Sequence, residues 1–272
     1  MSHDPTRPPA SRAEYLAVVQ PPDVMGRVNA EHWTGRLYMR KLSPFVSMPL
    51  TRTSIRPNQV TGMFIVVGWC IGAALLIPSI WGVLVCAVFA QLQMLLDCAD
   101  GEVARWKRMF SPAGEFLDRV GHFSAEGLLP LAIGLRAADL WGTPDWRWAA
   151  LGAATGGVVV FKKSLDPLVQ AARAGAGLPV LKDSSEHGEI ARGPLATLKR
   201  VAKAVPIMRI NTAMDMSFII LVVGLIGLAV GDLVAFRWLL AILAPLSALI
   251  AAAHFASIMA STKLKPTQPL DR

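Results

Sequence analysis

The chain has 272 residues, a formal net charge of +8 and a mean hydropathy of +0.45. Hydrophobic residues make up 53% of it and charged residues only 17%, whereas about 25% charged residues are usual in soluble domains, so the composition argues for a membrane protein. Apolar blocks separate the basic clusters, which argues against a nucleic-acid-binding groove. Cys70, Cys86 and Cys98 have no paired spacing, so neither a disulfide framework nor a thiolate zinc site is indicated.

The first part of the chain precedes any apolar block. Residues 1–27 are polar and contain several prolines and arginines, and we expect them to be disordered. In residues 28–56 the apolar residues Trp33, Leu37, Leu42 and Val46 alternate with basic ones, which is typical of an amphipathic helix lying on the membrane surface. A solvated linker is the alternative interpretation of this segment.

The apolar blocks predict the transmembrane helices. The run 57–96 carries no charge over 40 residues, and because about 20 residues cross a bilayer, it holds two spans separated by a turn at Pro78-Ser79. With four later segments, the expected spans are residues 59–77, 81–104, 114–135, 146–161, 213–230 and 236–260. The sequence therefore predicts an all-α integral membrane fold with six transmembrane helices in a catalytic domain over residues 57–260.

Lysine and arginine alternate between the connecting segments. Of the 27 basic residues, 23 fall in the N-terminal segment, the connection after the second span, the loop 162–212 and the tail 261–272. Because cytoplasmic segments carry the excess of positive charge, we expect both termini on the cytoplasmic side of a multi-pass protein of the cell membrane.

Two pairs of polar residues lie at the ends of expected spans. Asp97 and Asp100 are three residues apart, and Asp118 and His122 are four apart, so each pair shares a helix face. The connection between the two helices is short, so the faces can meet near the cytoplasmic boundary. Ionisable residues within spans are costly, which makes this group a functional candidate.

Grouped carboxylates repel one another unless a cation lies among them, and oxygen ligands favour Mg²⁺, Mn²⁺ or Ca²⁺. A divalent ion at a membrane surface suits the handling of a phosphate or diphosphate. The alternative is a pair of salt bridges, one from Asp97 or Asp100 to Arg105 and one from Asp118 to Arg119.

The pattern Asp97-x-x-Asp100-Gly101-x-x-Ala104-Arg105, followed by Gly114-x-x-x-Asp118-x-x-x-His122, resembles the signature of the CDP-alcohol phosphotransferase family of integral membrane enzymes. The family pattern ends in a fourth aspartate where this chain has His122. Upstream, Ile55-x-Pro57-Asn58-x-Val60-Thr61 is similar to the family's nucleotide-side segment. The likeness extends from about residue 50 to residue 260.

The resemblance implies a six-helix enzyme, with its site at the cytoplasmic end, that transfers a phosphate-bearing group from a CDP-linked donor to an alcohol and releases CMP. It implies that Asp97, Asp100 and Asp118 bind one or two Mg²⁺ or Mn²⁺ ions. The nucleotide-binding residues that it implies are Pro57, Asn58, Thr61, Asp97, Gly101, Ala104, Arg105 and Gly114. A homodimer is a further expectation from the resemblance.

His122 replaces the aspartate to which the family's base is usually assigned. Its unperturbed pKa of about 6.5 suits a general base, although imidazole is a poorer partner for Mg²⁺ than oxygen. Three interpretations stay open: His122 is a catalytic base near Asp118, another residue is the base, or the chain is a catalytically silent member that binds CDP-lipid.

The substrates are open as well. We expect a CDP-diacylglycerol-like donor and a small hydroxylated acceptor, and basic span ends favour a phosphorylated one. A CDP-linked head group with a lipid alcohol acceptor is the alternative. Candidate acceptor-binding residues are Lys162, Lys163, Arg173, Arg209, Asn211 and Asp215, although the basic ones also fit contacts to lipid phosphates.

Overall fold

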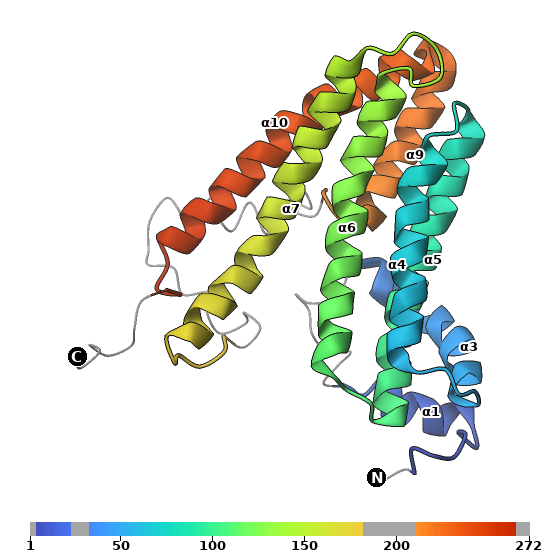
Figure 1. Cartoon of the computed structure of the whole chain (residues 1–272). Coiled ribbons are helices and arrows are strands. Elements are labelled where there is room, and N and C mark those ends of the chain that lie inside the picture. The colour runs from blue at the N-terminus through green and yellow to red at the C-terminus, as the bar shows by residue number, and fades with distance from the viewer. Residues whose placement is uncertain (1–3, 23–32, 182–209, 265–272) are drawn as a thin grey trace, which may run out of the picture. The chain divides into compact units, whose positions relative to one another are not determined.

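The fold was analysed in a computed structural model, which describes residues 4–22, 33–181 and 210–264. In these ranges every regular element is a helix (Figure 1). The chain divides into two compact units. The first comprises Met1–Ile77 and Trp81–Ala125, and the second comprises Pro78–Ile80 and Glu126–Arg272.

The first unit contains the helices that carry the signature residues. Its elements are α1 (Arg12–Val19), the π-helical turn η1 (Gly35–Met39), α3 (Arg40–Thr51), α4 (Pro57–Leu75), nearly all of α5 (Ile80–Lys107) and the first half of α6 (Pro112–Ala137). Pro57 opens α4, where its fixed φ suits the first helical position. Ser111 precedes α6 and its Oγ accepts from the Gly114 amide at 3.1 Å, which satisfies a donor of the first turn.

An apolar cluster holds these helices together. Its buried members are Val60, Phe64 and Ile65 from α4 and Leu96 and Ala99 from α5. They recur at helical spacing on each element, so each helix buries one stripe against the other. The cluster therefore fixes the end of α5 that bears the aspartates.

The N-terminal region differs from the expectation of disorder, because residues 12–19 form helix α1. Ser11 caps it by accepting from the Glu14 amide at 3.1 Å. Tyr15 and Val19 are fully buried against Trp106 of α5. A helix of eight residues is marginal alone, so this packing stabilises it; a contact across some 90 residues leaves no local pattern in the sequence.

The segment that follows was expected to be an amphipathic helix at residues 28–56. In its described part, η1 leads into α3, and Trp33, Leu37, Leu42 and Phe45 expose much of their apolar surface. Val46 differs, because it packs against the apolar cluster of α4 and α5. A helix is thus present over residues 40–51, while its amphipathic character and its place on a membrane surface stay predictions.

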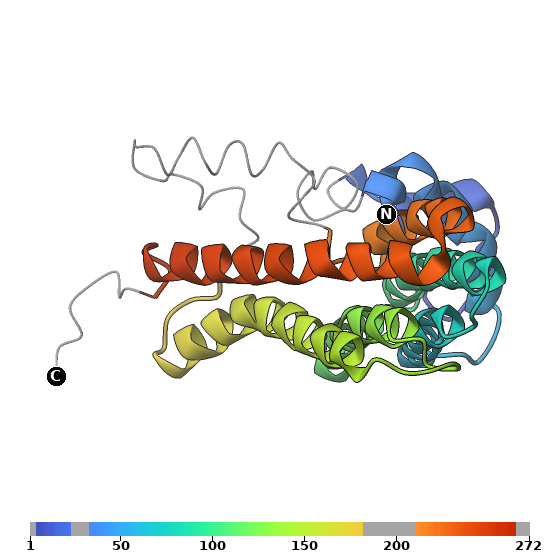
Figure 2. The same cartoon turned by 90° about the horizontal axis from the view of Figure 1, so that it is seen from above.

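The second unit contains α7 (Trp146–Gly175), α9 (Ala213–Val230), α10 (Asp232–Met259) and the second half of α6. Helix α10 packs along α7 and α9, and Figure 2 shows its course beside α7. Arg136 of α6, which is almost fully buried, donates to Asp232 at 2.7 and 2.9 Å and to the Ser79 carbonyl at 3.0 Å. A buried arginine with this many partners fixes the helix ends around it.

Four of the described helices, α4, α5, α9 and α10, are long and apolar enough to cross a membrane. Helices α6 and α7 lie where the third and fourth spans were expected, and α7 continues to Gly175 instead of ending at residue 161. Residues 182–209 of the expected cytoplasmic loop lie outside the described ranges. The all-helical class is therefore confirmed, and the count of six spans stays a prediction.

Candidate functional site

Asp97, Asp118 and His122 form one group within the first unit. One ligand atom from each lies within 4.8 Å of the others. The Nε2 atom of His122 is 3.4 Å from Asp97 Oδ1 and 3.6 Å from Asp118 Oδ1. All three side chains are partly exposed. This acidic group is therefore open to a ligand.

Local packing sets the position of His122 in the acidic group. Its ring stands edge-on to Phe64 with the centroids 5.0 Å apart. Phe64 is fully buried and also fills the space beside Gly121, where a Cβ atom would overlap its ring. The glycine before His122 thus lets α6 approach α4 closely enough for this contact.

Asp100 is held separately from the acidic group. Its Oδ2 accepts from Thr61 Oγ1 at 2.7 Å, and Thr61 also donates to the Pro57 carbonyl at 3.2 Å. Thr61 is 3% exposed, so it is a fixed part of α4. Three of the four signature polar residues are therefore grouped by direct contact, and the fourth is oriented by α4.

A cavity of about 500 Å³ adjoins the acidic group, because Asp118 lines it as well. This volume is within the range of small-molecule sites. Its other lining residues are Pro57, Asn58, Thr61, Asp100, Gly101, Ala104, Met109, Phe110, Ser111, Pro112, Gly114 and Glu115. Gly114 faces Asn58, whose Oδ1 would be 3.0 Å from an added Cβ. Gly101, Ala104 and Gly114 thus line this pocket, and their expected role in making room for the nucleotide stays a prediction.

Six of the eight residues expected to bind the nucleotide line the pocket, and Asp97 and Arg105 do not. Asp97 belongs to the acidic group, while the terminal nitrogens of Arg105 lie beside Gly101, 3.2 and 3.4 Å from where its Cβ would be. The sequence reasoning missed the wall formed by residues 109–112 and Glu115, because a connecting loop has no periodic pattern. The only feature of the sequence that could have indicated this wall is the short length of the loop, which keeps it close to the ends of α5 and α6.

Neither of the salt bridges proposed as an alternative is found among the described residues. Arg119 pairs with Glu115 along α6. Arg105 donates from Nε to the Val19 carbonyl at 2.6 Å. The aspartates are therefore not neutralised by these arginines through ion pairs.

The donor set of the acidic group fits a divalent cation. Two carboxylates and an imidazole converge within 4.8 Å, and carboxylate oxygens are the ligands that Mg²⁺ and Mn²⁺ prefer. Like charges at this separation favour a bound cation. His122 gives the set one nitrogen where an all-aspartate set would have only oxygen.

The candidate acceptor-binding residues that are described lie in the second unit. Lys163 Nζ is 2.9 and 2.7 Å from the carboxylate oxygens of buried Glu126. Arg173 donates to the carbonyls of Pro179 at 2.9 and 3.1 Å and of Lys263 at 2.5 Å. Both basic side chains thus interact with a carboxylate or with main-chain carbonyls of the second unit.

The remaining candidates have other surroundings. Asn211 is buried and accepts from Ser247 at 3.0 Å, while Asp215 accepts from Thr212 at the start of α9. Lys162 is partly buried on α7. Arg209 lies outside the described residues.

These features define a multi-pass membrane protein whose polar site joins a divalent-cation donor set to a small-molecule pocket. Residues 54–176 match the profile of the CDP-alcohol phosphatidyltransferase family, so the chain contains a domain of this family. Members of this family are transferases of lipid synthesis that use a CDP-alcohol donor and an alcohol acceptor and in general depend on divalent metal. No curated protein matches the chain.

Proposed function

We propose that the chain transfers a phosphatidyl-type group from CDP-diacylglycerol to a small hydroxylated acceptor, with release of CMP. The observation that carries the proposal is the shared position of Asp118, which belongs to the acidic group and also lines the 500 Å³ pocket. A diphosphate in the pocket would thus lie next to a cation held by the acidic group. In the reaction the bond from the transferred phosphorus to the CMP oxygen breaks, and the acceptor oxygen forms the new bond.

Asp97 and Asp118 would hold the cation, with Asp100 as a further ligand if two Mg²⁺ or Mn²⁺ ions bind, because the Nε2 lone pair of His122 is needed to take the acceptor's proton. The bound metal would neutralise the charge that develops on the diphosphate oxygens. Thr61 supports this assignment, because its hydrogen bond orients Asp100. The cytidine nucleotide would lie against Gly101, Ala104 and Gly114, where the lining side chains are small, with Asn58 beside it.

We propose His122 as the base that takes the acceptor's proton on Nε2. Its contacts with Asp97 and Asp118 support this role, because two carboxylates stabilise the imidazolium that would form. Its ring is oriented by Phe64. We also propose that candidate residues of the second unit bind the acceptor, with Lys162 as the first to test.

The expected topology completes the proposal. Six spans, with α6 and α7 added to the four apolar helices, would place both termini and the acidic group on the cytoplasmic side. The exposed apolar residues Trp33, Leu37 and Phe45 support contact of the segment before α4 with the membrane surface.

The test is CMP release by the purified full-length chain with Mg²⁺ or Mn²⁺, CDP-diacylglycerol and a panel of alcohols and phospho-alcohols. We expect release with at least one acceptor and a phospholipid product identified by mass. Release only with a CDP-linked head group and a lipid alcohol would support the alternative donor. CDP binding without CMP release from any combination would identify a silent CDP-lipid-binding member.

A further inference from the structure

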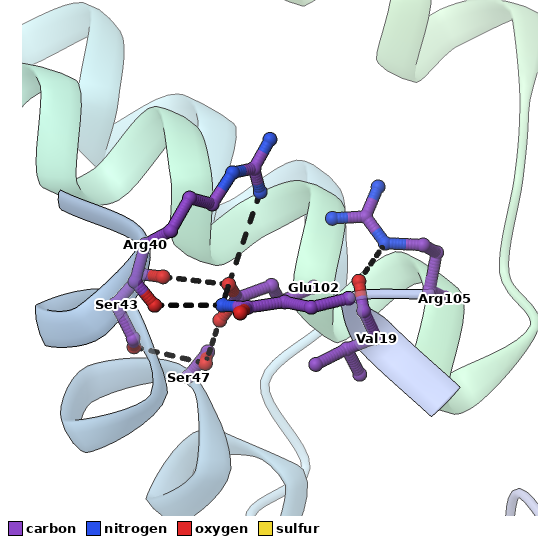
Figure 3. A network of polar contacts seen from close by, with 7 residues as sticks. Val19, Arg40, Ser43, Ser47, Glu102 and Arg105 are labelled. Carbon is purple, nitrogen blue, oxygen red and sulfur yellow. Dashed lines mark hydrogen bonds and ion pairs between the residues drawn. The ribbon is translucent and has the colours of Figure 1, made fainter. Parts of the chain in front are cut away.

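The last two turns of α5 bear a second polar network, centred on the fully buried Glu102. Its Oε1 accepts from Ser43 at 2.6 Å and from Gln20 at 2.7 Å, and its Oε2 accepts from Ser47 at 2.5 Å. Arg40 adds an ion pair at 3.8 Å. Figure 3 shows the serines and Arg40 directed at this carboxylate. Glu102 thus joins the N-terminal region to the helix that carries the signature.

The N-terminal segment 4–20 is attached to α5 at several further points. The ring of Tyr15 packs on Trp106 with the centroids 5.4 Å apart, and both side chains are fully buried. Trp106 Nε1 donates to the Arg7 carbonyl at 3.2 Å. Burial raises the pKa of Tyr15, so its phenol stays neutral in this contact. Apolar packing and main-chain bonds together fix where α1 ends.

The end of α1 contacts the signature arginine. Arg105 Nε donates to the Val19 carbonyl at 2.6 Å, as Figure 3 shows. Its terminal nitrogens lie beside Gly101, which lines the pocket. A guanidinium held through Nε loses much of its rotational freedom, so its remaining donors keep a fixed direction.

From these contacts we propose that the N-terminal segment 4–20 is a positioning element of the nucleotide site, which orients Arg105 toward the diphosphate of the CDP-linked donor. The inference rests on the proposed donor. Val19 acts through its carbonyl on Arg105, while Gln20 and Tyr15 hold α1 in place against Glu102 and Trp106. They are positioning residues, since Arg105 is the group that would touch the phosphates.

The experiment measures binding of CDP, in the presence of Mg²⁺ or Mn²⁺, to the full-length chain and to Gln20→Ala and Tyr15→Ala variants. We expect both to weaken CDP binding about tenfold, the effect of losing one well-oriented charged hydrogen bond. Tyr15→Phe keeps the ring on Trp106 and should bind CDP as the unmodified chain does. Gln170→Ala removes a partly buried glutamine of α7 that bonds to the Leu181 main chain, so it is the matched control for Gln20→Ala and should also leave CDP binding unchanged.

A double-mutant cycle separates positioning from general loss of structure. In an Arg105→Ala background the Gln20→Ala and Tyr15→Ala changes should weaken CDP binding no further, because their target is gone. In the active chain the same changes should raise KM for the CDP-linked donor and leave KM for the acceptor unchanged.

Two results would overturn the inference: unchanged CDP binding in both variants, or effects that add fully to that of Arg105→Ala. The proposed function has a separate readout, since CDP binding needs no turnover. A chain that binds CDP, obeys the cycle and releases no CMP would contradict the transferase proposal alone. A chain that binds no CDP would contradict both.

Discussion

Two carboxylates of α5, Glu102 and Asp97, lie within a few residues of each other and have opposite environments. Glu102 is fully buried and accepts three hydrogen bonds, with Arg40 as an ion pair. Asp97 is partly exposed, and its partners in the acidic group are a second carboxylate and a histidine. The carboxylate of Glu102 thus has its hydrogen-bond and ion-pair partners within the protein. The acidic group, by contrast, gathers negative charge that the described residues do not balance by ion pairs with Arg105 or Arg119.

This difference distinguishes a structural carboxylate from a binding one. A buried charge costs several kcal/mol unless it is paired and hydrogen-bonded, so Glu102 needs all its partners for folding. Carboxylates that face each other at a partly open surface gain most from an added cation. Substitutions should therefore affect folding at the first site and ligand binding and activity at the second.

The largest effect is expected from Asp118→Asn, which removes a charge from the acidic group while keeping its shape. CMP release should fall by about three orders of magnitude, because the metal loses a ligand. Thermal unfolding in detergent should stay near that of the unmodified chain. Activity within a few-fold of the original would exclude Asp118 as a ligand.

Glu102→Ala tests the structural carboxylate and should affect folding. Removing the buried carboxylate deletes three accepted hydrogen bonds and the ion pair with Arg40, and we expect a loss of about 3–5 kcal/mol in the free energy of unfolding. Denaturant titration measures it, with Glu115→Ala on the exposed face of α6 as the control. A loss under about 1 kcal/mol would mean that the network is not structural.

His122→Ala tests the base, and we expect CMP release to fall about a hundredfold, within the usual contribution of a general base. His122→Asp restores the family's fourth aspartate and should retain activity with a stronger preference for Mg²⁺, since a carboxylate at this position could also ligate the ion. The ratio of rates with Mg²⁺ and Mn²⁺ measures this preference. Full activity in the alanine variant would assign the base to another residue.

The smallest effect is expected from Gly121→Ala, whose added methyl group overlaps the Phe64 ring. Overpacking of this kind costs about 1–3 kcal/mol of stability and should also displace His122. Gly62→Ala, where nothing lies within 4 Å of an added Cβ, is the control. Equal unfolding midpoints for the two variants would show that the Phe64 ring can move aside for the added methyl group at little cost in stability.

Where local spacing determines geometry, the sequence predicted which polar residues lie close together, while their roles stay proposals. The step of four between Asp118 and His122 and the short connection from α5 predicted that both lie near Asp97, and the small residues Gly101 and Gly114 do line a pocket. The fifth span agrees with α9 to the residue. Each of these features is determined by the residue spacing on one helix face or by the length of one apolar run, so the local sequence is enough to predict it.

The features that the sequence did not reveal depend on contacts between distant residues. Nothing near Tyr15 indicates that Trp106 will bury it, so α1 was expected to be disordered. Glu102 stood at a variable position of the signature, and its serine partners lie 55 and 59 residues away. Arg105 was expected to contact phosphates, and its bond to a carbonyl on α1 has no pattern in the sequence.

The buried contact between Tyr15 and Trp106 also affects where the N-terminal boundary of the stably folded domain lies. The family match starts at residue 54, yet the helix that carries its signature is covered by residues from α1 and α3. A fragment cut at the family boundary would leave Trp106 and Glu102 facing solvent. Expression of the isolated domain should therefore give an aggregating product, and the shortest stable fragment should retain the segment from Arg7 onward, whose carbonyl accepts from Trp106.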